Sequence, residues 1–302
     1  MRTFGVAEAM EGLSRTQLER LAYIDFRLYF MGDVGRPDLM CRFGIASAGA
    51  TRDIALYREL RPANIEFDGS SKSYRISECF APLFEHQPQR VLSALSLGFG
   101  DGLATDSQPL IICETPAVLS SPRMSVLAPI CRAIHLKRPI NIRYTSVSSG
   151  KSERVILPFA LIDTGLRWHI RAFDRKTGDF RDFVVTRIEA PVLLDGGPTS
   201  GERPADDIQW TRIVEVELVP HPDQPRPDVT ALDFNMHAGV IGLKLRAAVA
   251  GYMLRRWSVD CSSTHRLRGP EYRLWLRDHL SLYGVKSAVL APGFVSDLNG
   301  KS

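Results

Sequence analysis

Most of the short motifs by which enzymes are recognised are missing from this chain. It has no GxSxG nucleophile elbow, no HExxH zinc motif, no Walker-type phosphate loop and no GxGxxG dinucleotide loop. Each of these motifs sets a reactive or phosphate-binding group at a fixed spacing, so their absence argues against the corresponding enzyme classes. The glycines of GFGDG at 98–102 have no strand before them and no helix after them, which indicates a turn. The sequence predicts a protein that is not an enzyme and uses no metal or other cofactor.

Long apolar runs and paired cysteines are missing too. No apolar run reaches the ~18 residues that span a bilayer, and the N-terminal MRTFGVAEAMEG lacks the apolar centre of a secretory signal. The five cysteines, at 41, 79, 113, 131 and 261, are odd in number and include no CxxC pair. This usage is typical of reduced thiols, and we expect most of them to be buried. We therefore predict a cytoplasmic protein without membrane contact.

The charge is modest but uneven. With 44% hydrophobic and 24% charged residues the chain has the composition of a globular protein, and its formal net charge is only +4. Residues 1–80 hold 11 basic and 11 acidic side chains, whereas residues 125–195 hold 12 Lys/Arg against 7 Asp/Glu and residues 210–302 hold 12 against 9. A nucleic-acid-binding surface in the first segment must therefore be a local patch, not a bulk excess.

Residues 1–80 carry the signals of three helices and a hairpin. The first helix begins after Ser14, which forms a capping box with the Gln three residues later, and ends at Gly32. A second helix begins with Pro37, and a third, with Ser47 as its N-cap, runs to about Leu60. The segment IEFDGSSKSYRI at 65–76 then alternates around an Asp-Gly turn, which is typical of a hairpin. Together these signals predict a winged helix-turn-helix domain.

The third helix opens with very small side chains, in ASAGATRD at 46–53. Ala50, Ile54 and Tyr57 share one face and would hold the helix on its domain, while the small residues would let its N-terminal end lie deep in the ~12 Å wide major groove. Arg52 is then placed to contact a base, and Lys72 at the hairpin tip to contact a phosphate. An ordinary helical hairpin, whose small residues serve helix packing, is the alternative. The predicted DNA contacts are Arg36, Ser47, Ala48, Gly49, Thr51, Arg52, Ser71, Lys72 and Tyr74.

The remainder of the chain divides by composition. Residues 81–124, rich in Pro, Ser and Gly, are predicted to form a connector with a short helix near 88–97 and the strand-like LIICE at 110–114. In residues 125–195 a helix precedes four strand-like segments, a pattern that predicts a small, strongly bent sheet or barrel. A polar linker follows at 196–209.

Residues 210–302 have the pattern of a small α+β unit. RIVEVELVP alternates as a strand, LKLRAAVAGYMLRRW and EYRLWLRDHL are expected to be helices, and SAVLAP a final strand. Trp257, Trp275 and Leu276, among basic residues, are the expected dimer contact. The predicted fold class is therefore a multidomain α+β protein.

Basic and aromatic residues alternate in the predicted barrel. In RWHIRAFD, Arg167, His169 and Arg171 share one strand face, and in RDFVVTRI, Arg181 and Arg187 share another. Guanidinium groups bind phosphate bidentately and stack on rings, so this cluster favours an anionic ligand with a flat base. The alternative for any one arginine is a surface ion pair with a nearby aspartate.

The segment at 167–188 resembles the signature of WYL domains. Trp168-His169-Ile170 stands where the family has Trp-Tyr-Leu, and the downstream Arg-x-Phe…Arg-Ile pattern is matched from Arg181 to Ile188. The upstream elements also fit, with Tyr144 at the end of an aliphatic strand and Arg154 four residues before a proline. The resemblance implies a small SH3/Sm-like barrel with a leading helix that senses a ligand. The residues so assigned to ligand binding are Tyr144, Arg154, Trp168, His169, Arg171, Arg181 and Arg187.

With FGI-x-S near 43–47 and PANIEFD at 62–68, the resemblance extends over nearly the whole chain, to the WYL-domain repressors of bacterial anti-phage operons of the CapW/BrxR type. It implies a homodimeric, sequence-specific repressor that binds an inverted-repeat DNA operator and is released by a nucleotide or nucleic-acid fragment. The C-terminal segment would serve dimerisation. Two alternatives share these residues: a ligand-dependent activator, and an accessory protein that senses single-stranded nucleic acid and uses its winged helix for protein contacts.

Overall fold

The computed structural model describes residues 10–99, 109–114, 116 and 119–295. The chain divides into two compact units, residues 1–116 and 117–302, and each is described by itself. Across the described residues, no helix has both the length and the apolar character needed to cross a membrane.

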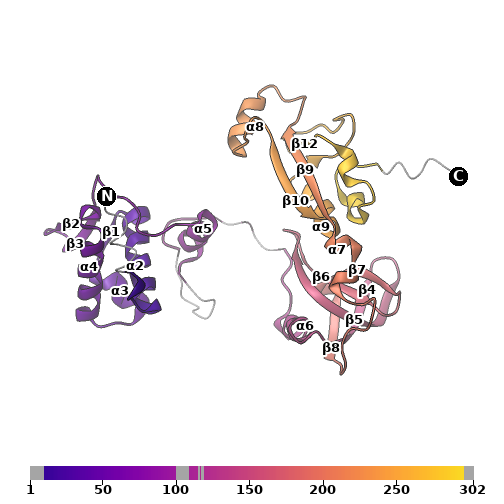
Figure 1. Ribbon diagram of the computed structural model, residues 1–302, viewed down its shortest axis with the longest axis horizontal. Helices are drawn as coiled ribbons and strands as arrows, with labels where there is room; N and C mark the ends of the chain where they lie inside the picture. The colour runs from indigo at the N-terminus through magenta and orange to yellow at the C-terminus, as the bar shows by residue number, and fades with distance from the viewer. Residues whose placement is uncertain (1–9, 100–108, 115, 117–118, 296–302) are drawn as a thin grey trace. The chain divides into compact units, whose positions relative to one another are not determined.

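The first unit is a winged three-helix fold (Figure 1). Its strands form a small antiparallel sheet in the order β1-β3-β2. Its elements are α2 (Arg15–Phe26), a π-helical turn (Arg27–Met31), β1 (Asp33–Val34), α3 (Arg36–Phe43), α4 (Ser47–Leu60), β2 (Ile65–Asp68), β3 (Ser73–Ile76) and α5 (Pro88–Leu97).

The helix ends follow the sequence signals with one correction. The capping box of Ser14 and Gln17 is present, and Gly32 ends the first helix in the left-handed region, with φ of 85°. The N-cap of α4, however, is Ala46, which makes no side-chain capping bond, so Ser47 is the first helical residue. The hydroxyl of Ser47 is therefore not used to cap the helix.

Helix α4 is held on its domain by one apolar face and two polar ties. Ala50, Ile54 and Tyr57 are buried, as the helical pattern predicts. The guanidinium of Arg20 on α2 donates to the buried carboxylate of Asp53, with an Nε–Oδ2 distance of 2.6 Å. Since Asp53 directly follows Arg52, this pair fixes the rotation of the exposed face of α4.

The second polar tie is centred on Asp25, which is fully buried. Its carboxylate accepts a 2.5 Å hydrogen bond from the hydroxyl of Tyr57 on α4 and one of 3.0 Å from the backbone N–H of Leu83, and lies 2.8 Å from Nε2 of His86. The start of the expected connector is therefore packed onto the first unit. The expected helix near 88–97 is present as α5, but Leu110–Glu114 form no strand, and residues 100–102 of the glycine-rich segment lie outside the described residues.

The second unit begins with α6 (Met124–Leu136), which contacts β5 and β8 of a strongly curved five-stranded antiparallel sheet (Figure 1). The strand order is β7-β6-β5-β4-β8. The fourth expected segment is divided in two by a 3₁₀ turn at Val185–Arg187. The strands are β4 (Ile140–Ser146), β5 (Gly150–Asp163), β6 (Trp168–Asp174), β7 (Asp179–Val184) and β8 (Ile188–Leu193).

The polar segment at 196–209 is fastened to this sheet by two arginines. Arg175 donates to both carboxylate oxygens of Glu202, at 2.7 and 2.9 Å. Arg171 does the same to Asp207, at 2.7 and 3.1 Å. Bidentate pairs of this kind have defined geometry as well as strength, so the segment has a fixed path over the sheet.

The C-terminal part continues with α7 (Ile208–Thr211), β9 (Ile213–Pro220), α8 (Pro227–Asp233), β10 (Ile241–Arg246), α9 (Ala247–Arg256), β11 (Val259–Asp260) and β12 (Leu274–Leu276). Its sheet has the order β10-β9-β12-β11. Two 3₁₀ turns, His279–Leu282 and Lys286–Leu290, close it.

Three expectations for this part were wrong. The expected first helix is a strand at Ile241–Arg246 followed by α9, because Leu243 and Leu245 alternate toward the core and pair with β9. EYRLWLRDHL holds strand β12 and a 3₁₀ turn instead of a helix, and SAVLAP lies in the 3₁₀ turn Lys286–Leu290 instead of a strand. Short apolar runs do not distinguish helix from strand by period, and here sheet pairing decided.

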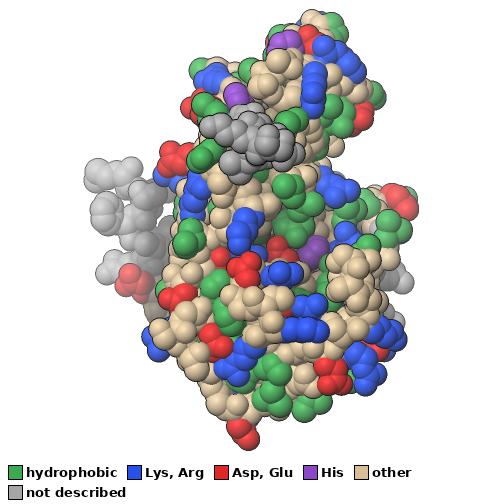
Figure 2. Space-filling view, turned by 90° about the vertical axis from the view of Figure 1, so that its right-hand side faces the viewer, with side chains coloured by type: hydrophobic (Ala, Val, Ile, Leu, Met, Phe, Trp, Pro, Cys, Tyr) green, Lys and Arg blue, Asp and Glu red, His purple; other side chains and the backbone are tan. Residues whose placement is uncertain are grey.

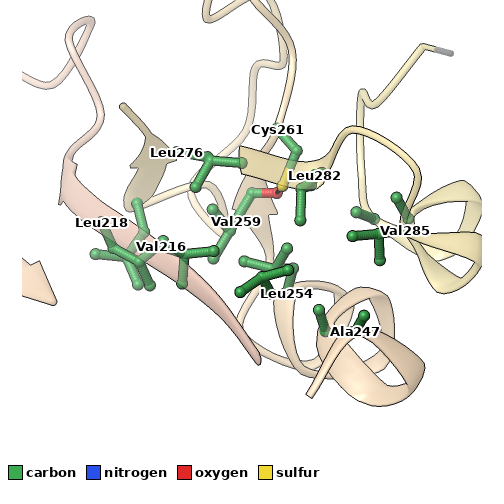
Figure 3. Close-up of a cluster of buried hydrophobic side chains, with 14 residues drawn as sticks. Val216, Leu218, Ala247, Leu254, Val259, Cys261, Leu276, Leu282 and Val285 are labelled. Carbon is green, nitrogen blue, oxygen red and sulfur yellow. Dashed lines mark hydrogen bonds between the residues drawn. The ribbon is translucent and has the colours of Figure 1, made fainter. Parts of the chain in front are cut away.

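Leu276 lies in the apolar core of this part, together with Val216, Leu254 and Val259 (Figure 3). It is 0% exposed, so it does not belong to a subunit contact as expected. The indole N–H of Trp275 is also used internally, since it donates to the carbonyl of Ser262. The cysteines correct another expectation: all five are free thiols, but only Cys261 is buried and the other four are exposed.

Candidate DNA-binding surface and anion pocket

The exposed side of α4 carries most of the residues predicted to contact DNA. Ser47, Ala48, Thr51 and Arg52 are all exposed, while the opposite face is buried. The hydroxyl of Thr51 donates to the carbonyl of Ser47, and Nε of Arg52 lies 3.4 Å from the carbonyl of Ala48. The Arg52 guanidinium has no acidic partner among the described residues, so it remains able to bind an acceptor outside the chain.

A hollow of about 560 Å³ unites parts of this surface. It is bordered by Arg36 at the start of α3, Ser47 at the start of α4, and Ser71 and Lys72 at the wing tip. Two aspartates on its rim, Asp33 and Asp38, are both paired with Arg27, which balances one of their two negative charges. The start of α4, where no side chain caps the helix, lies beside this hollow, and such a helix end favours anions such as phosphate.

The wing tip is shaped by Asp68. Its carboxylate accepts hydrogen bonds from the backbone N–H and hydroxyl of Ser70 and from the hydroxyl of Ser71, and these bonds lower the pKa of Asp68. Lys72 at the apex has a positive φ of 52° and an exposed side chain. Tyr74 is half-buried on β3, where its ring lies 5.1 Å from that of Phe67, and it does not line the hollow.

The fold does not require a glycine at position 49. A Cβ atom at this position would lie 3.7 Å from Cβ of Ile45, an ordinary contact, and its φ is not in the left-handed region. Gly49 therefore belongs to the group of small residues at the start of α4, although packing would tolerate a larger side chain there.

A second hollow, of about 430 Å³, lies between the barrel and the C-terminal part. Three of the seven predicted ligand-binding residues line it: Tyr144, His169 and Arg187. The hydroxyl of Tyr144 accepts a 3.3 Å hydrogen bond from the backbone N–H of Val184, which fixes the ring at one edge. Figure 2 shows Lys and Arg side chains gathered around a histidine in the middle of the visible face.

The other four predicted residues lie elsewhere. Arg154 and Arg171 are ion-pair partners: the partly buried Arg154 pairs with Asp174, and the buried Arg171 pairs with both Asp207 and Asp182. Trp168, 41% exposed, and Arg181, also exposed, do not line the hollow. For Arg154 and Arg171 the alternative reading of the sequence, an ion pair with an aspartate, is therefore the observed one.

His169 occupies the wall of the hollow and is 4% exposed. Desolvation by burial lowers the pKa of its imidazole, the nearby Asp182 opposes this shift, and Arg167 and Arg187 add to it. Its Nδ1 atom is buried without a hydrogen-bond partner in the described part of the chain. Because this atom is enclosed by the protein, His169 shapes the wall of the hollow and does not present Nδ1 to it.

Sequence reasoning missed the other wall of this hollow. It is formed by Tyr252, Arg255 and Arg256 of α9, and Arg167 completes the basic rim. The Arg-Arg pair at 255–256 is visible in the sequence, but nothing in its pattern indicates that α9 lies against a barrel more than 60 residues earlier.

Three family models match this chain. The BrxR transcriptional regulator winged helix-turn-helix domain matches residues 16–96, the WYL domain residues 125–193, and the BrxR transcriptional regulator C-terminal dimerization domain residues 213–282. A DNA-binding transcriptional repressor CapW of Escherichia coli is 30% identical over 290 residues, which cover 91% of this chain and 93% of the relative.

The chain belongs to the CapW family of transcriptional repressors. CapW repressors of Pseudomonas aeruginosa and Stenotrophomonas maltophilia are each 30% identical as well, over 82% and 81% of this chain and 85% and 84% of their own lengths. This CapW-family member therefore has the predicted three-part layout of a winged helix, a WYL domain and a C-terminal dimerization domain. The family is one of regulators, and the expectation of a non-enzyme is confirmed.

Proposed function

We propose that this protein is a homodimeric, sequence-specific DNA-binding repressor of a bacterial anti-phage defence operon, acting in the cytoplasm. In this proposal residues 1–80 bind an inverted-repeat operator, residues 125–195 sense a ligand and residues 210–302 dimerise. Residues 81–124 and 196–209 join these parts. Dimer symmetry then requires half-sites about one helical turn of DNA, or a multiple, apart.

One observation carries the DNA-binding part. Arg36, Ser47, Ser71 and Lys72, which are separated by up to 36 positions in the sequence, border the same hollow beside the exposed, small-residue start of α4. This arrangement offers a helix to the major groove and basic groups on both sides of it to the phosphates. A helical hairpin whose small residues serve packing would bury Ala48 and Thr51, and both are exposed.

Ligand release is the second part of the proposal. The pocket bordered by Tyr144, His169 and Arg187 suits a nucleotide or nucleic-acid fragment, because guanidinium groups bind phosphate and aromatic rings accept a base. The ligand weakens operator binding only through unequal affinity for the DNA-bound and free conformations.

The proposal is tested by fluorescence anisotropy with a labelled duplex from upstream of the protein's own gene and a scrambled duplex, over a salt series. We expect selective binding whose log affinity falls with log salt by ~0.9 for each neutralised phosphate. Arg52→Ala should weaken operator binding by ~1–3 kcal/mol, about 5- to 150-fold, if Arg52 contacts a base. Arg58→Ala, at the exposed far end of α4, is the matched control for loss of one positive charge.

Equal and weak binding to both duplexes would contradict the repressor proposal. Equal losses for Arg52→Ala and Arg58→Ala on both duplexes would show that α4 contributes charge alone and reads no base.

A further inference from the structure

The second hollow has an unusual balance of charge. Four guanidinium groups border it, from Arg167, Arg187, Arg255 and Arg256, and within the described residues none of their side chains has an ion-pair or hydrogen-bond partner. The one acidic side chain on its lining, Asp182, is already bound to Arg171 and to the hydroxyl of Tyr252, at 3.1 Å each. Five other arginines of the barrel domain are paired with carboxylates, namely Arg138, Arg143, Arg154, Arg171 and Arg175, whereas the four around the hollow have no such partner in the part of the chain that the structure describes.

The two pairs of arginines come from different domains. Arg167 precedes β6 and Arg187 lies in the 3₁₀ turn between β7 and β8, whereas Arg255 and Arg256 form the last turn of α9. Helix α9 is anchored in the C-terminal core by Leu254, which is fully buried. A ligand that bound all four groups would therefore connect the barrel to the core of the dimerization domain.

The contact between the two walls is close at Gly165. The Arg256 side chain lies over this residue, since a Cβ atom there would be 2.6 Å from Nε of Arg256 and 2.7 Å from Cζ. Gly165 has a φ of +79°, in the left-handed region that favours glycine. The turn between β5 and β6 thus has the conformation and the lack of a side chain that bring the α9 arginine onto the barrel.

We propose that this hollow is a composite site, in which α9 of the C-terminal domain supplies half of the groups that hold a small ligand carrying at least two phosphates. At least two phosphates suit four guanidinium groups that have no carboxylate partner among the described residues, because each guanidinium binds phosphate bidentately. A volume of about 430 Å³ fits a nucleotide-sized molecule and not a folded partner. The apolar side chains of Leu166 and Leu290 on the lining accommodate the remainder of such a ligand.

The composite site rests on the proposed function as a ligand-controlled repressor, and it adds a way in which ligand binding reaches the dimerization domain. A bound ligand neutralises the positive charges of the two walls, which otherwise repel one another. It therefore favours the conformation in which α9 lies against the barrel. Since α9 belongs to the dimerization domain, the ligand biases the geometry of that domain directly, without needing a change inside the barrel.

The test uses the full-length protein and three phosphate probes: 5′-phosphorylated tetrathymidylate, ATP and inorganic pyrophosphate. Binding to the wild type is compared by calorimetry with Arg187→Gln, with Arg255→Gln/Arg256→Gln and with Arg226→Gln. Arg226 is the control because it is an exposed arginine of the same domain that is paired with Asp228 and does not line this hollow. Thermal unfolding of each variant checks that its fold is retained.

We expect Arg187→Gln and the α9 double variant each to weaken binding of the preferred probe about 10- to 100-fold, as loss of charge-assisted hydrogen bonds predicts. Arg226→Gln should bind within about twofold of the wild type. The preferred probe separates a nucleic-acid fragment from a nucleoside polyphosphate or a simple diphosphate. Wild-type binding by the α9 double variant, or no binding of any probe by the wild type at about 1 mM, overturns the proposal.

Operator binding, measured without probe on the same variants, keeps the two proposals apart. The α9 variant should bind operator as the wild type does but lose the weakening caused by the probe. A protein that binds a phosphate probe through α9 and has no operator preference would refute the repressor proposal and leave the composite site in place.

Discussion

Removing the hydroxyl of Tyr57 should destabilise the first unit by about 1.5–3 kcal/mol, the usual contribution of a buried hydrogen bond to a charged group. Tyr57 is 0% exposed and donates to the carboxylate of Asp25 at 2.5 Å. In Tyr57→Phe the ring remains, and Asp25 retains the backbone N–H groups of Leu83 and Phe84 and the contact with His86. The hydroxyl of Tyr57 also accepts a 2.9 Å hydrogen bond from Nδ2 of Asn64, but this amide retains the carbonyl of Ala81 as a partner. The loss should therefore be dominated by the hydrogen bond to Asp25 and should not be that of the whole cluster.

The distribution of tryptophan allows this loss to be assigned to the first unit. All four tryptophans, at 168, 210, 257 and 275, belong to the second unit. In urea, circular dichroism follows both units, while tryptophan fluorescence follows the second alone. With an m-value of ~2 kcal/mol/M, the variant should lower the midpoint of the first unit's transition by about 1 M. The fluorescence transition should stay in place.

Tyr29→Phe is the matched control, since Tyr29 belongs to the same unit, is 47% exposed and has no hydroxyl hydrogen bond to the described residues. Its midpoint should not move. If Tyr57→Phe leaves the circular dichroism transition unchanged, or moves the fluorescence transition equally, then the Asp25 cluster does not hold α4 in place as argued.

Three further predictions follow from single side chains. Lys72→Ala should weaken binding to the operator duplex and to the scrambled duplex equally, because a phosphate contact carries no sequence information. It should also lower the slope of log affinity against log salt by ~0.9. A slope equal to that of the wild type would exclude Lys72 from the interface. Arg171→Met should destabilise the second unit by ~3–5 kcal/mol, because Asp207 and Asp182 would lose their buried partner. The control Arg181→Met changes an exposed arginine and should alter the stability by no more than ~0.5 kcal/mol. Unfolding followed by tryptophan fluorescence measures both effects, and equal effects would count against the structural role of Arg171. His169→Gln should reduce the pH dependence of the second unit's stability. Burial lowers the pKa of His169 below its ordinary value of ~6.5, so the wild type loses stability as the pH falls through that ordinary value. If both proteins lose the same stability between pH 7.5 and 5.5, the imidazole stays solvated in the folded protein.

Much of the first unit could be predicted because its signals are local. Helix caps, the Asp-Gly hairpin and the buried stripe of α4 each depend on residues within a few positions of one another. Turns between the strands of the second unit also depend on local residues, since Gly150, Gly165 and Gly178 all have the positive φ that glycine favours. Where the local signal was ambiguous, as in the C-terminal segments at 243–246 and 271–280, the expected helices were strands or 3₁₀ turns, because pairing with β9 determined the backbone.

The candidate ligand site shows the opposite case. Alternation along β6 placed Arg171 and His169 on one face, but it could not indicate that Arg171 is neutralised by Asp207 from a segment 36 residues later, nor that Arg181 faces solvent. Strand alternation gives two faces and does not say what covers each one.

The sequence by itself determined the family, the order of the three domains and the exposed, small-residue face of α4, since these depend on motifs and on periodicity along one element. Only the tertiary structure decided which basic side chains are free. A guanidinium is available to a ligand when no carboxylate reaches it, and the carboxylates that reach Arg154 and Arg171 come from other elements of the fold. The same folding brings Arg255 and Arg256 beside Arg167 and Arg187, across a distance in sequence that no local pattern spans.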